Sequence, residues 1–465
     1  MTTLLPGPDE RRRAYAQLTE LIERHLDGID DLAVAPSASY EELEERLRGF
    51  DFAAPVPLEE LVEATGGLLS DGIVHTSHPR YFGLFNPAPT FAGVLADALV
   101  AAFNPQLAAT SHAPAAVAVE RHVISFLADC LGLSGASGTF TSGGAEANLT
   151  GLLVALERHF PEATEHGLAA VGERPTFYVS GEAHDSFVKA ARMTGLGQRA
   201  ARPVPVAADL RLEVEALRAA VERDRAAGER PFLAVATAGT TAGGIVDPLP
   251  RVADVCAEFG LDLHVDAAWA GAAALSERLR SVLDGMGRAD SVTVDAHKWL
   301  SAPMGAGVFL TRHSRDLTST FRVAAGYMPS AESTDPYLTS AQWSRRFIGL
   351  KVFMSLAAAG RAGYAAQIER DCRLGDRLRD RLRESGWEVV NRTPLPVICF
   401  VPAAPADAAE LTRIAAAVEA SGDAWISVAR LGGRPALRAC IISHGTTEAD
   451  VDALFESLER ARRAA

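Results

Sequence analysis

The pattern of apolar and polar positions divides the 465-residue chain into three parts, of which the first is helical. Apolar residues recur at helical spacing over residues 9–28, 39–49 and 58–70, with proline-containing connectors between these segments. The apolar stripes are too few to build a good core of their own. We therefore predict a helical N-terminal arm over residues 1–75 that packs on another surface, such as a partner subunit.

In the second part, helical segments alternate with short apolar strands. The predicted strands are Gly138–Thr141, Thr176–Val179, Phe232–Thr237, Leu263–Asp266, Ser291–Val294 and Gly307–Leu310, and the predicted helices include Ala115–Leu131, Ala145–Arg158 and Ser186–Met193. Such alternation is typical of a mostly parallel sheet with helices on both faces. We assign residues 76–350 to one large α/β domain.

A long predicted helix, which starts at Arg346 and continues past Gly360, leads into the third part. Its predicted strands are Trp387–Val390, Val397–Val401, Ile426–Val428 and Ala436–Ile441, and a last helix covers Asp450–Arg463. This rhythm predicts a small α+β domain over residues 351–465.

Composition and charge limit the partners. The chain is 48% hydrophobic and 22% charged, and its formal net charge of -14 argues against nucleic acid or an anionic membrane as the main partner. The apolar stretch Phe91–Phe103 is too short to span a bilayer, and the N-terminus lacks a signal-peptide pattern. Five scattered cysteines suggest free thiols rather than a zinc site. We therefore expect a cytoplasmic protein without a metal.

Lys298 is the strongest candidate for chemistry. It follows the predicted strand Ser291–Val294, lies next to His297, and precedes the glycine-rich run 303–307. An amine held at a strand end becomes a nucleophile once desolvation lowers its pKa, which suits a Schiff base with an aldehyde such as pyridoxal phosphate. A solvated loop lysine is the ordinary alternative.

Three further elements lie at the ends of predicted strands. Gly143 and Gly144 stand at a strand-to-helix junction, where backbone N–H groups and the helix dipole can bind phosphate. Asp266 ends an apolar strand and could pair with a protonated pyridine nitrogen, and His184 could stack on a ring. Each has an ordinary alternative when it is taken singly: the glycine pair could form a tight turn, the aspartate could cap a helix, and the histidine could be a packing residue. Their convergence at the carboxyl ends of strands, where open α/β sheets bind ligands, favours a shared site.

Through these and neighbouring elements the chain resembles the group II pyridoxal-phosphate-dependent decarboxylases, which include the aromatic L-amino acid and glutamate decarboxylases. The segments that carry the resemblance are His78–Phe82, Thr141–Asn148, Ala183–His184, Thr237–Thr241, His264–Trp269, Asp295–Leu300 and Arg345–Phe347. The resemblance implies fold type I, which is aspartate-aminotransferase-like and has a mostly parallel seven-stranded sheet. It also implies pyridoxal 5'-phosphate as cofactor and a homodimer with shared active sites.

The resemblance also implies roles for individual residues. Lys298 would bind the cofactor aldehyde, Asp266 would pair with the pyridine nitrogen, His184 would stack on the ring and His297 would lie beside the substrate. The remaining cofactor-binding residues would be Ser142, Gly143, Gly144, Ala145, Thr241 and Asp295. The family has asparagine or another polar residue where this chain has Asp295.

Tyr327 bears on the reaction. It lies 29 residues after Lys298, where decarboxylases of this family carry a proton-donating tyrosine and the related aldehyde synthases typically have phenylalanine. The resemblance therefore favours decarboxylation of an L-amino acid to its amine and CO2. An aldehyde synthase and an aminotransferase remain open, the latter because Arg438 resembles a carboxylate-binding arginine in placement. A regulatory module without catalysis would be expected to lack Lys298, Asp266 or His184.

Substrate choice depends on a predicted pocket. By resemblance its lining includes Tyr81, Phe82, Leu84 and Asn86, together with Phe103 from the partner subunit. The apolar character of this set favours an aromatic or bulky apolar amino acid. Arg80 leaves an acidic amino acid as an alternative.

Overall fold

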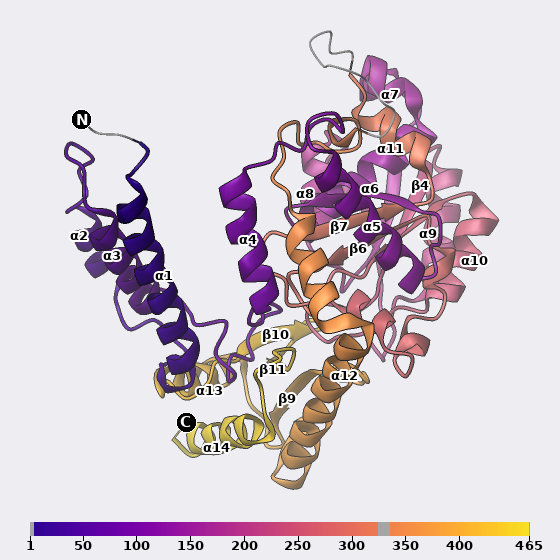
Figure 1. The fold of residues 1–465 in the computed structure, drawn as a ribbon. Helices are drawn as coiled ribbons and strands as arrows, with labels where there is room; N and C mark the ends of the chain where they lie inside the picture. Colours follow the sequence, from indigo (N-terminus) through magenta and orange to yellow (C-terminus); the bar gives the residue numbers. More distant parts are fainter. Residues whose placement is uncertain (1–3, 324–334, 465) are drawn as a thin grey trace.

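The computed structural model describes residues 4–323 and 335–464. Figure 1 shows a central sheet between helices, a smaller C-terminal unit below it, and an N-terminal group of helices standing to one side. A large, mostly parallel seven-stranded sheet and a separate four-stranded sheet confirm the predicted α/β fold with a small α+β unit. The domain limits at residues 75 and 350 stay a prediction.

The large sheet has the strand order β1-β7-β6-β5-β4-β2-β3. Strand β7 runs antiparallel to β1 and β6, and the other neighbouring pairs are parallel. The strands are β1 Ser137–Thr141, β2 Pro175–Ser180, β3 Ala201–Val204, β4 Arg230–Thr237, β5 Asp262–Asp266, β6 Ser291–Asp295 and β7 Gly307–Thr311. Thr237, Asp266 and Thr293 are paired in register across β4, β5 and β6. The carboxyl ends of these strands therefore form one edge.

Helices cover both faces of this sheet. They are α5 Pro114–Cys130, α6 Gly144–His159, α7 Pro161–His166, α8 Ser186–Met193, α9 Val214–Ala226, α10 Leu249–Phe259 and α11 Ser314–Phe321. The sequence analysis did not predict β3, because this strand is only four residues long and contains Pro203. Proline cannot donate a ladder hydrogen bond, and it is tolerated here because β3 is the edge strand.

The C-terminal unit has an antiparallel sheet of order β10-β11-β9-β8. Its elements are β8 Trp387–Val389, β9 Val397–Pro402, α13 Ala408–Ala420, β10 Ser427–Leu431, β11 Arg434–Cys440 and α14 Glu448–Ala464. Helix α12, Gly349–Glu384, connects it to the large sheet and is interrupted at Gly360, whose φ of 66° is outside the helical region. Tyr364 of α12 packs in the large core, whereas Leu374 packs in the core of the C-terminal unit.

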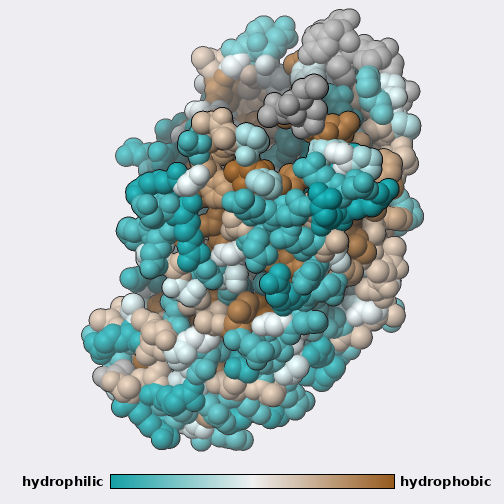
Figure 2. All heavy atoms as spheres, turned by 60° about the vertical axis from the view of Figure 1, so that its left-hand side comes forward, coloured by the Kyte–Doolittle hydropathy of each residue, from teal (hydrophilic) through white to brown (hydrophobic). Residues whose placement is uncertain are grey.

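The N-terminal arm consists of α1 Pro8–Gly28, α2 Tyr40–Leu47 and α3 Leu58–Gly72. None of these three helices contains a buried residue. Figure 1 shows helix α4, Phe91–Phe103, beside the arm, and the arm touches the C-terminal unit where the Val34 N–H donates to Gly422 O at 3.3 Å. Hydrophobic patches interrupt the otherwise hydrophilic surface on this side of the molecule, as Figure 2 shows. Among the described helices, none combines the length and apolarity that a membrane crossing requires.

Candidate active site

The turn between β1 and α6 presents unused backbone donors. Among the described residues, the N–H groups of Gly143, Gly144 and Ala145 have no hydrogen-bond partner. A side chain at Gly144 would not fit, because its Cβ would lie 2.7 Å from Asp295 Oδ2 and 3.4 Å from Ala268 Cβ. Free amides at a helix N-terminus attract an anion, so the turn has the donor set that a phosphate group needs.

Ser142, in contrast, is already engaged. Its backbone N–H and its hydroxyl both donate to Glu146 Oε2, each at 2.7 Å. Gln342 donates to both oxygens of the same carboxylate, at 2.8 and 3.0 Å. The cofactor contact predicted for Ser142 would therefore require Glu146 to release it.

Lys298 meets a carboxylate of its own turn. Its Nζ lies 3.0 Å from Asp295 Oδ2, and its side chain is 25% exposed, against 2% for Asp295. His297 Nε2 lies 3.9 Å from the same oxygen. Because the N–H of Ala306 donates to His297 Nδ1 at 3.2 Å, the neutral ring carries its proton on Nε2. Burial lowers the pKa of His297, so the imidazole is neutral near pH 7.

Asp266 is a buried carboxylate that has no cation beside it in the described part of the chain. It accepts hydrogen bonds from Asn148 Nδ2 at 2.9 Å and from the N–H of Ala268 at 3.0 Å. Among the described residues it forms no ion pair, although it is only 5% exposed. A buried anion held by neutral donors alone is costly, and a protonated ring nitrogen would compensate its charge.

Asn148 and His264 fix that carboxylate. His264 Nε2 lies 3.2 Å from Asn148 Oδ1, and its Nδ1 lies 2.8 Å from Ser291 Oγ. Burial lowers the pKa of His264 to about 4, so a neutral ring that donates from Nε2 and accepts at Nδ1 orients the amide of Asn148. The sequence carried a signal for His264, because residues two apart on one strand share a face with Asp266.

His184 joins the same network through Ser186. The N–H of Ser186 donates to His184 Nδ1 at 3.2 Å, and Ser186 Oγ accepts from Asn148 Nδ2 at 2.9 Å. The ring of His184 is exposed in this chain. One ion pair and a chain of hydrogen bonds thus run without a break from Lys298 through Asp295, Ala268, Asp266, Asn148 and Ser186 to His184. Gly144 lies close to this chain, because a Cβ built on it would be 2.7 Å from Asp295 Oδ2 and 3.4 Å from Ala268 Cβ. The structure brings the four predicted elements together.

Thr241 lies beside a buried arginine. Its carbonyl oxygen accepts from Arg438 Nη1 at 2.6 Å, while the other ends of that guanidinium donate to Gly83 O and Ser427 Oγ, both at 3.0 Å. Arg438 is 5% exposed and forms no ion pair with a described residue. Its positive charge is therefore uncompensated, although its donors are largely used.

The predicted substrate residues lie in three different environments. Tyr81 donates its hydroxyl to Asn86 Oδ1 at 3.0 Å, and burial raises the pKa of Tyr81 to about 12. Leu84 and Phe103 are exposed. Phe82, however, is fully buried in the core of the C-terminal unit, which gives no support to a substrate contact. The segment is held there because the Phe82 N–H donates to Trp425 O at 2.8 Å. Tyr327 lies outside the described residues.

Two contacts from α12 hold the turn that carries Lys298. Trp299 Nε1 donates to Asp371 Oδ2 at 2.8 Å, and the Tyr364 hydroxyl donates to Leu300 O at 3.0 Å. Burial raises the pKa of Asp371 to about 7. Sequence reasoning missed these contacts, because the partners lie more than 60 positions apart and no local pattern joins them.

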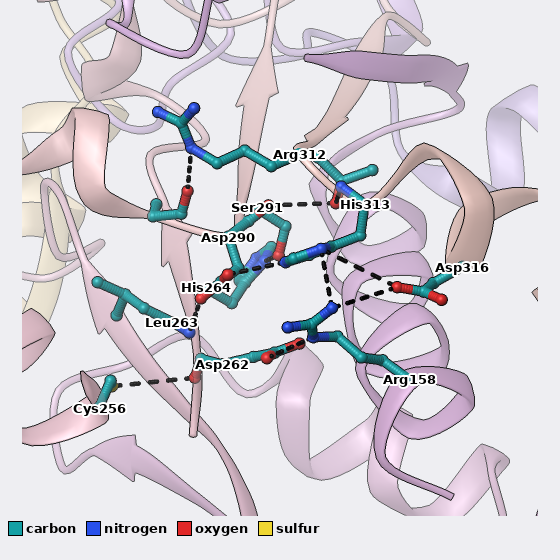
Figure 3. A network of polar contacts seen from close by, with 12 residues as sticks. Arg158, Cys256, Asp262, Leu263, His264, Asp290, Ser291, Arg312, His313 and Asp316 are labelled. Carbon is teal, nitrogen blue, oxygen red and sulfur yellow. Dashed lines mark hydrogen bonds and ion pairs between the residues drawn. The ribbon is translucent and has the colours of Figure 1, made fainter. Parts of the chain in front are cut away.

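A second polar network lies at the opposite end of the same strands, as Figure 3 shows. The atoms of Asp262, Asp290 and His313 that could bind a metal ion, two carboxylate oxygens and a ring nitrogen, lie within 4.8 Å of one another. Arg158 Nε lies 3.1 Å from Asp262 Oδ1, and its Nη1 lies 3.1 Å from His313 Nδ1. Its guanidinium supplies the positive charge here, so the network is one of ion pairs that join α6 to β5 and β6.

The geometry fits the expected cofactor in two respects. The three free amides of the β1–α6 turn match a phosphate, and the uncompensated Asp266 matches a protonated pyridine nitrogen. Lys298 adds an amine at the same strand edge. Gly143, Gly144, Ala145, Asp266 and Lys298 would hold the group.

Comparisons with known proteins identify the family. The model of the pyridoxal-dependent decarboxylase conserved domain matches residues 47–402. An aromatic-L-amino-acid decarboxylase of Bacillus atrophaeus is 30% identical over 453 residues, which is 94% of this chain and 92% of that protein. The acidic amino acid decarboxylase GADL1 of Mus musculus is 31% identical over 70% of this chain and 60% of its own length.

A solved structure agrees over the whole chain. The crystal structure of Oryza sativa TDC with PLP and tryptamine has a TM-score of 0.93 at 26% sequence identity, and the match covers 100% of this chain and 99% of that one. The family match, the shared fold and the site geometry lead to one conclusion. The chain belongs to the pyridoxal-phosphate-dependent amino acid decarboxylases, a family of lyases.

Proposed function

We propose that this enzyme converts an aromatic or bulky apolar L-amino acid into its amine and CO2. The observation that supports the reaction type is that the Lys298 amine and the Asp266 carboxylate, which forms no ion pair with a described residue, stand at the carboxyl ends of the neighbouring strands β6 and β5. When bound, pyridoxal phosphate supplies an aldehyde for amine exchange and a conjugated ring that accepts the electron pair left by CO2. The protein has to orient the substrate and deliver a proton to Cα.

Named residues would divide this work. Asp266, held by Asn148 and Ala268, would keep the ring nitrogen protonated and so favour electron withdrawal. Lys298 would hold the cofactor until the amine of the substrate takes its place, and the released lysine amine could then move protons. His297, neutral and with its Nε2 proton toward Asp295, would face the substrate side. We propose these roles on the contacts and on the family resemblance together.

The apolar substrate class is supported by the residues around the predicted pocket. Phe85 stacks on Trp269 with ring centroids 4.6 Å apart, and Tyr81 keeps a protonated hydroxyl against Asn86. Arg80 pairs with Asp450 at 3.1 Å, so its charge is already compensated and would not select an acidic side chain. The Bacillus atrophaeus relative, named an aromatic-L-amino-acid decarboxylase, supports the same class.

An acidic amino acid is the second candidate. Arg438 is a buried cation without an acidic partner among the described residues, and a substrate carboxylate could compensate it. The similarity to acidic amino acid decarboxylase GADL1 supports this alternative. The two candidates predict different substrates for the same purified enzyme.

A screen of amino acids distinguishes them. The purified enzyme, loaded with pyridoxal phosphate, is supplied with each amino acid, and CO2, amine and aldehyde are quantified separately. We expect the highest kcat/KM with an aromatic or bulky apolar substrate. A preference for an aspartate-like or glutamate-like substrate would favour the second candidate, and a requirement for a keto acid would show an aminotransferase.

Tyr327→Phe is expected to divert the product from amine to aldehyde. The phenylalanine cannot donate a proton to Cα, and at this position it matches the residue that aldehyde synthases of the family typically carry. The measurement is the ratio of aldehyde to amine formed from the best substrate. Tyr337→Phe is a matched control, because this buried tyrosine packs on Trp343 and should leave the ratio unchanged. Unchanged amine formation without aldehyde in Tyr327→Phe would remove Tyr327 from the mechanism.

We also propose a homodimer with shared active sites. On α4, Phe91, Leu95, Leu99 and Phe103 recur every four residues and are between 44% and 81% exposed. Residues at this spacing form one apolar stripe, which a partner subunit would cover together with the unburied arm.

Five free cysteines, four of them buried, support a reducing compartment such as the cytoplasm.

The double variant Leu95→Asp/Leu99→Asp is expected to dissociate the dimer. Burial of each leucine contributes about 1.5–3 kcal/mol, so two charges on each stripe should raise the dimer dissociation constant about 100-fold or more. Light scattering over a concentration series measures it. Met193→Asp changes an exposed side chain on α8 and should leave the dimer intact. A monomeric wild type at all concentrations would contradict the assembly.

A further inference from the structure

Asp295 places a carboxylate beside the turn that would bind the cofactor phosphate. Its Oδ2 lies 3.0 Å from Lys298 Nζ and would lie 2.7 Å from a Cβ built on Gly144. The carboxylate therefore touches the first residue of α6. Two anions at one turn repel each other unless a cation or a proton stands between them.

The other oxygen of this carboxylate has no hydrogen-bond partner in the part of the chain that the structure describes. Asp295 Oδ1 is buried and accepts no hydrogen bond from a described residue. An unsatisfied buried acceptor is costly, so the oxygen is arranged for a donor that enters with a ligand. A fully ionised phosphate would satisfy the free N–H groups of Gly143, Gly144 and Ala145, but it has no hydrogen to give to Asp295.

The surrounding charges do not remove the conflict. Lys298 is the nearest cation, and His297 is neutral near pH 7 because burial lowers its pKa. Lys351 on α12 pairs with Asp97 at 3.2 Å, and Glu146 in the first turn of α6 adds another carboxylate. One ammonium thus faces Asp295 and a phosphate dianion, which together carry three negative charges.

We propose that Asp295 makes the enzyme bind the phosphate ester of its cofactor with one shared proton. The ester is a dianion in solution above its second pKa of about 6. On binding it would take up one proton, which lies between a phosphate oxygen and Asp295 Oδ1, and no other bond forms or breaks. An asparagine at this position would offer an N–H to the phosphate and would need no such proton. The inference rests on the proposed phosphate site at α6.

Calorimetry with ligands that lack the aldehyde tests this proposal. The cofactor-free full-length enzyme is titrated with 4'-deoxypyridoxine 5'-phosphate and with unphosphorylated 4'-deoxypyridoxine, in buffers of different ionisation enthalpy. At pH 7.5 we expect the phosphate to add an uptake of about one proton in the wild type. The affinity for the phosphorylated ligand should fall about tenfold per pH unit between pH 6.5 and 8.5. In Asp295→Asn both effects should vanish.

A second measurement uses the wild-type enzyme alone, so it does not depend on the folding of a variant. The ³¹P resonance of the bound ligand should keep its protonated position at pH values where the free ligand is a dianion. Asp290→Asn, at the other end of β6, is the matched control and should retain proton uptake. A wild type that binds the dianion without proton uptake overturns the inference. Equal affinity for the two ligands in the wild type and in both variants would instead reject the phosphate site itself.

Discussion

Replacing Lys298 with alanine is expected to lower the decarboxylation rate by about 10³-fold or more, because the chain would lose both its covalent attachment point and a proton carrier. The variant should also lose the visible absorbance near ~420 nm that marks a lysine-bound cofactor. The melting temperature should also fall, because Asp295 is only 2% exposed and would lose the ammonium group that lies 3.0 Å from it. Steady-state kinetics, absorbance and thermal unfolding measure the three quantities.

The composition of the chain makes this test unusually sharp. The sequence contains three lysines, namely Lys189, Lys298 and Lys351. Borohydride reduction of the loaded enzyme followed by peptide mass mapping should label Lys298 alone. Lys351 is the competing amine, because burial lowers its pKa, but it is held by Asp97 and by Met304 O at 2.7 Å. Lys189→Ala, on the exposed side of α8, should keep full labelling and activity. Labelling at Lys351 would contradict the assignment.

The fold was largely predictable because burial leaves a strong local pattern. Six strands of the large sheet are short apolar runs whose limits differ by at most two residues from the structure, as β4 and β5 illustrate. β3 lacked that pattern, since an edge strand needs less apolar surface and can contain Pro203. The apolar spacing also predicted the three helices of the arm, none of which contains a residue buried within this chain, and their packing on a partner subunit stays a prediction.

The placement of the candidate site residues was predictable only where it depends on the local sequence. Lys298, Asp266 and the glycine pair stand at strand ends, and parallel strands bring such ends together. Contacts between distant positions left no signal. The engagement of Ser142 by Glu146 depends on side-chain rotamers, and the burial of Phe82 depends on its pairing with Trp425. Arg80 likewise finds Asp450, which lies 370 positions later in the chain.

Asp266→Ala is expected to weaken binding of the protonated cofactor ring by about 30- to 5000-fold, because removal of one partner of a buried charge pair costs about 2–5 kcal/mol. The hydrogen bonds that hold the neighbouring Asn148 should largely survive the substitution. Asn148 would lose one acceptor but keep Ser186 Oγ, and its orientation by His264 would persist. The measured quantities are the dissociation constant of pyridoxal phosphate and kcat/KM.

Rescue by a permanently charged ring separates an electrostatic role of Asp266 from a structural one. A cofactor methylated on the pyridine nitrogen keeps its positive charge without a carboxylate, and the alanine leaves room for the methyl group. This analogue should restore part of the activity of Asp266→Ala and should perform poorly in the wild type, where the methyl group would meet the carboxylate. Asp262→Asn, at the start of the same strand, is the matched control: it breaks the ion pair with Arg158, so it should lower stability, and the analogue should not rescue it. Failure of the analogue to rescue a folded Asp266→Ala variant would mean that Asp266 acts by shaping the site rather than by holding the charge of the ring.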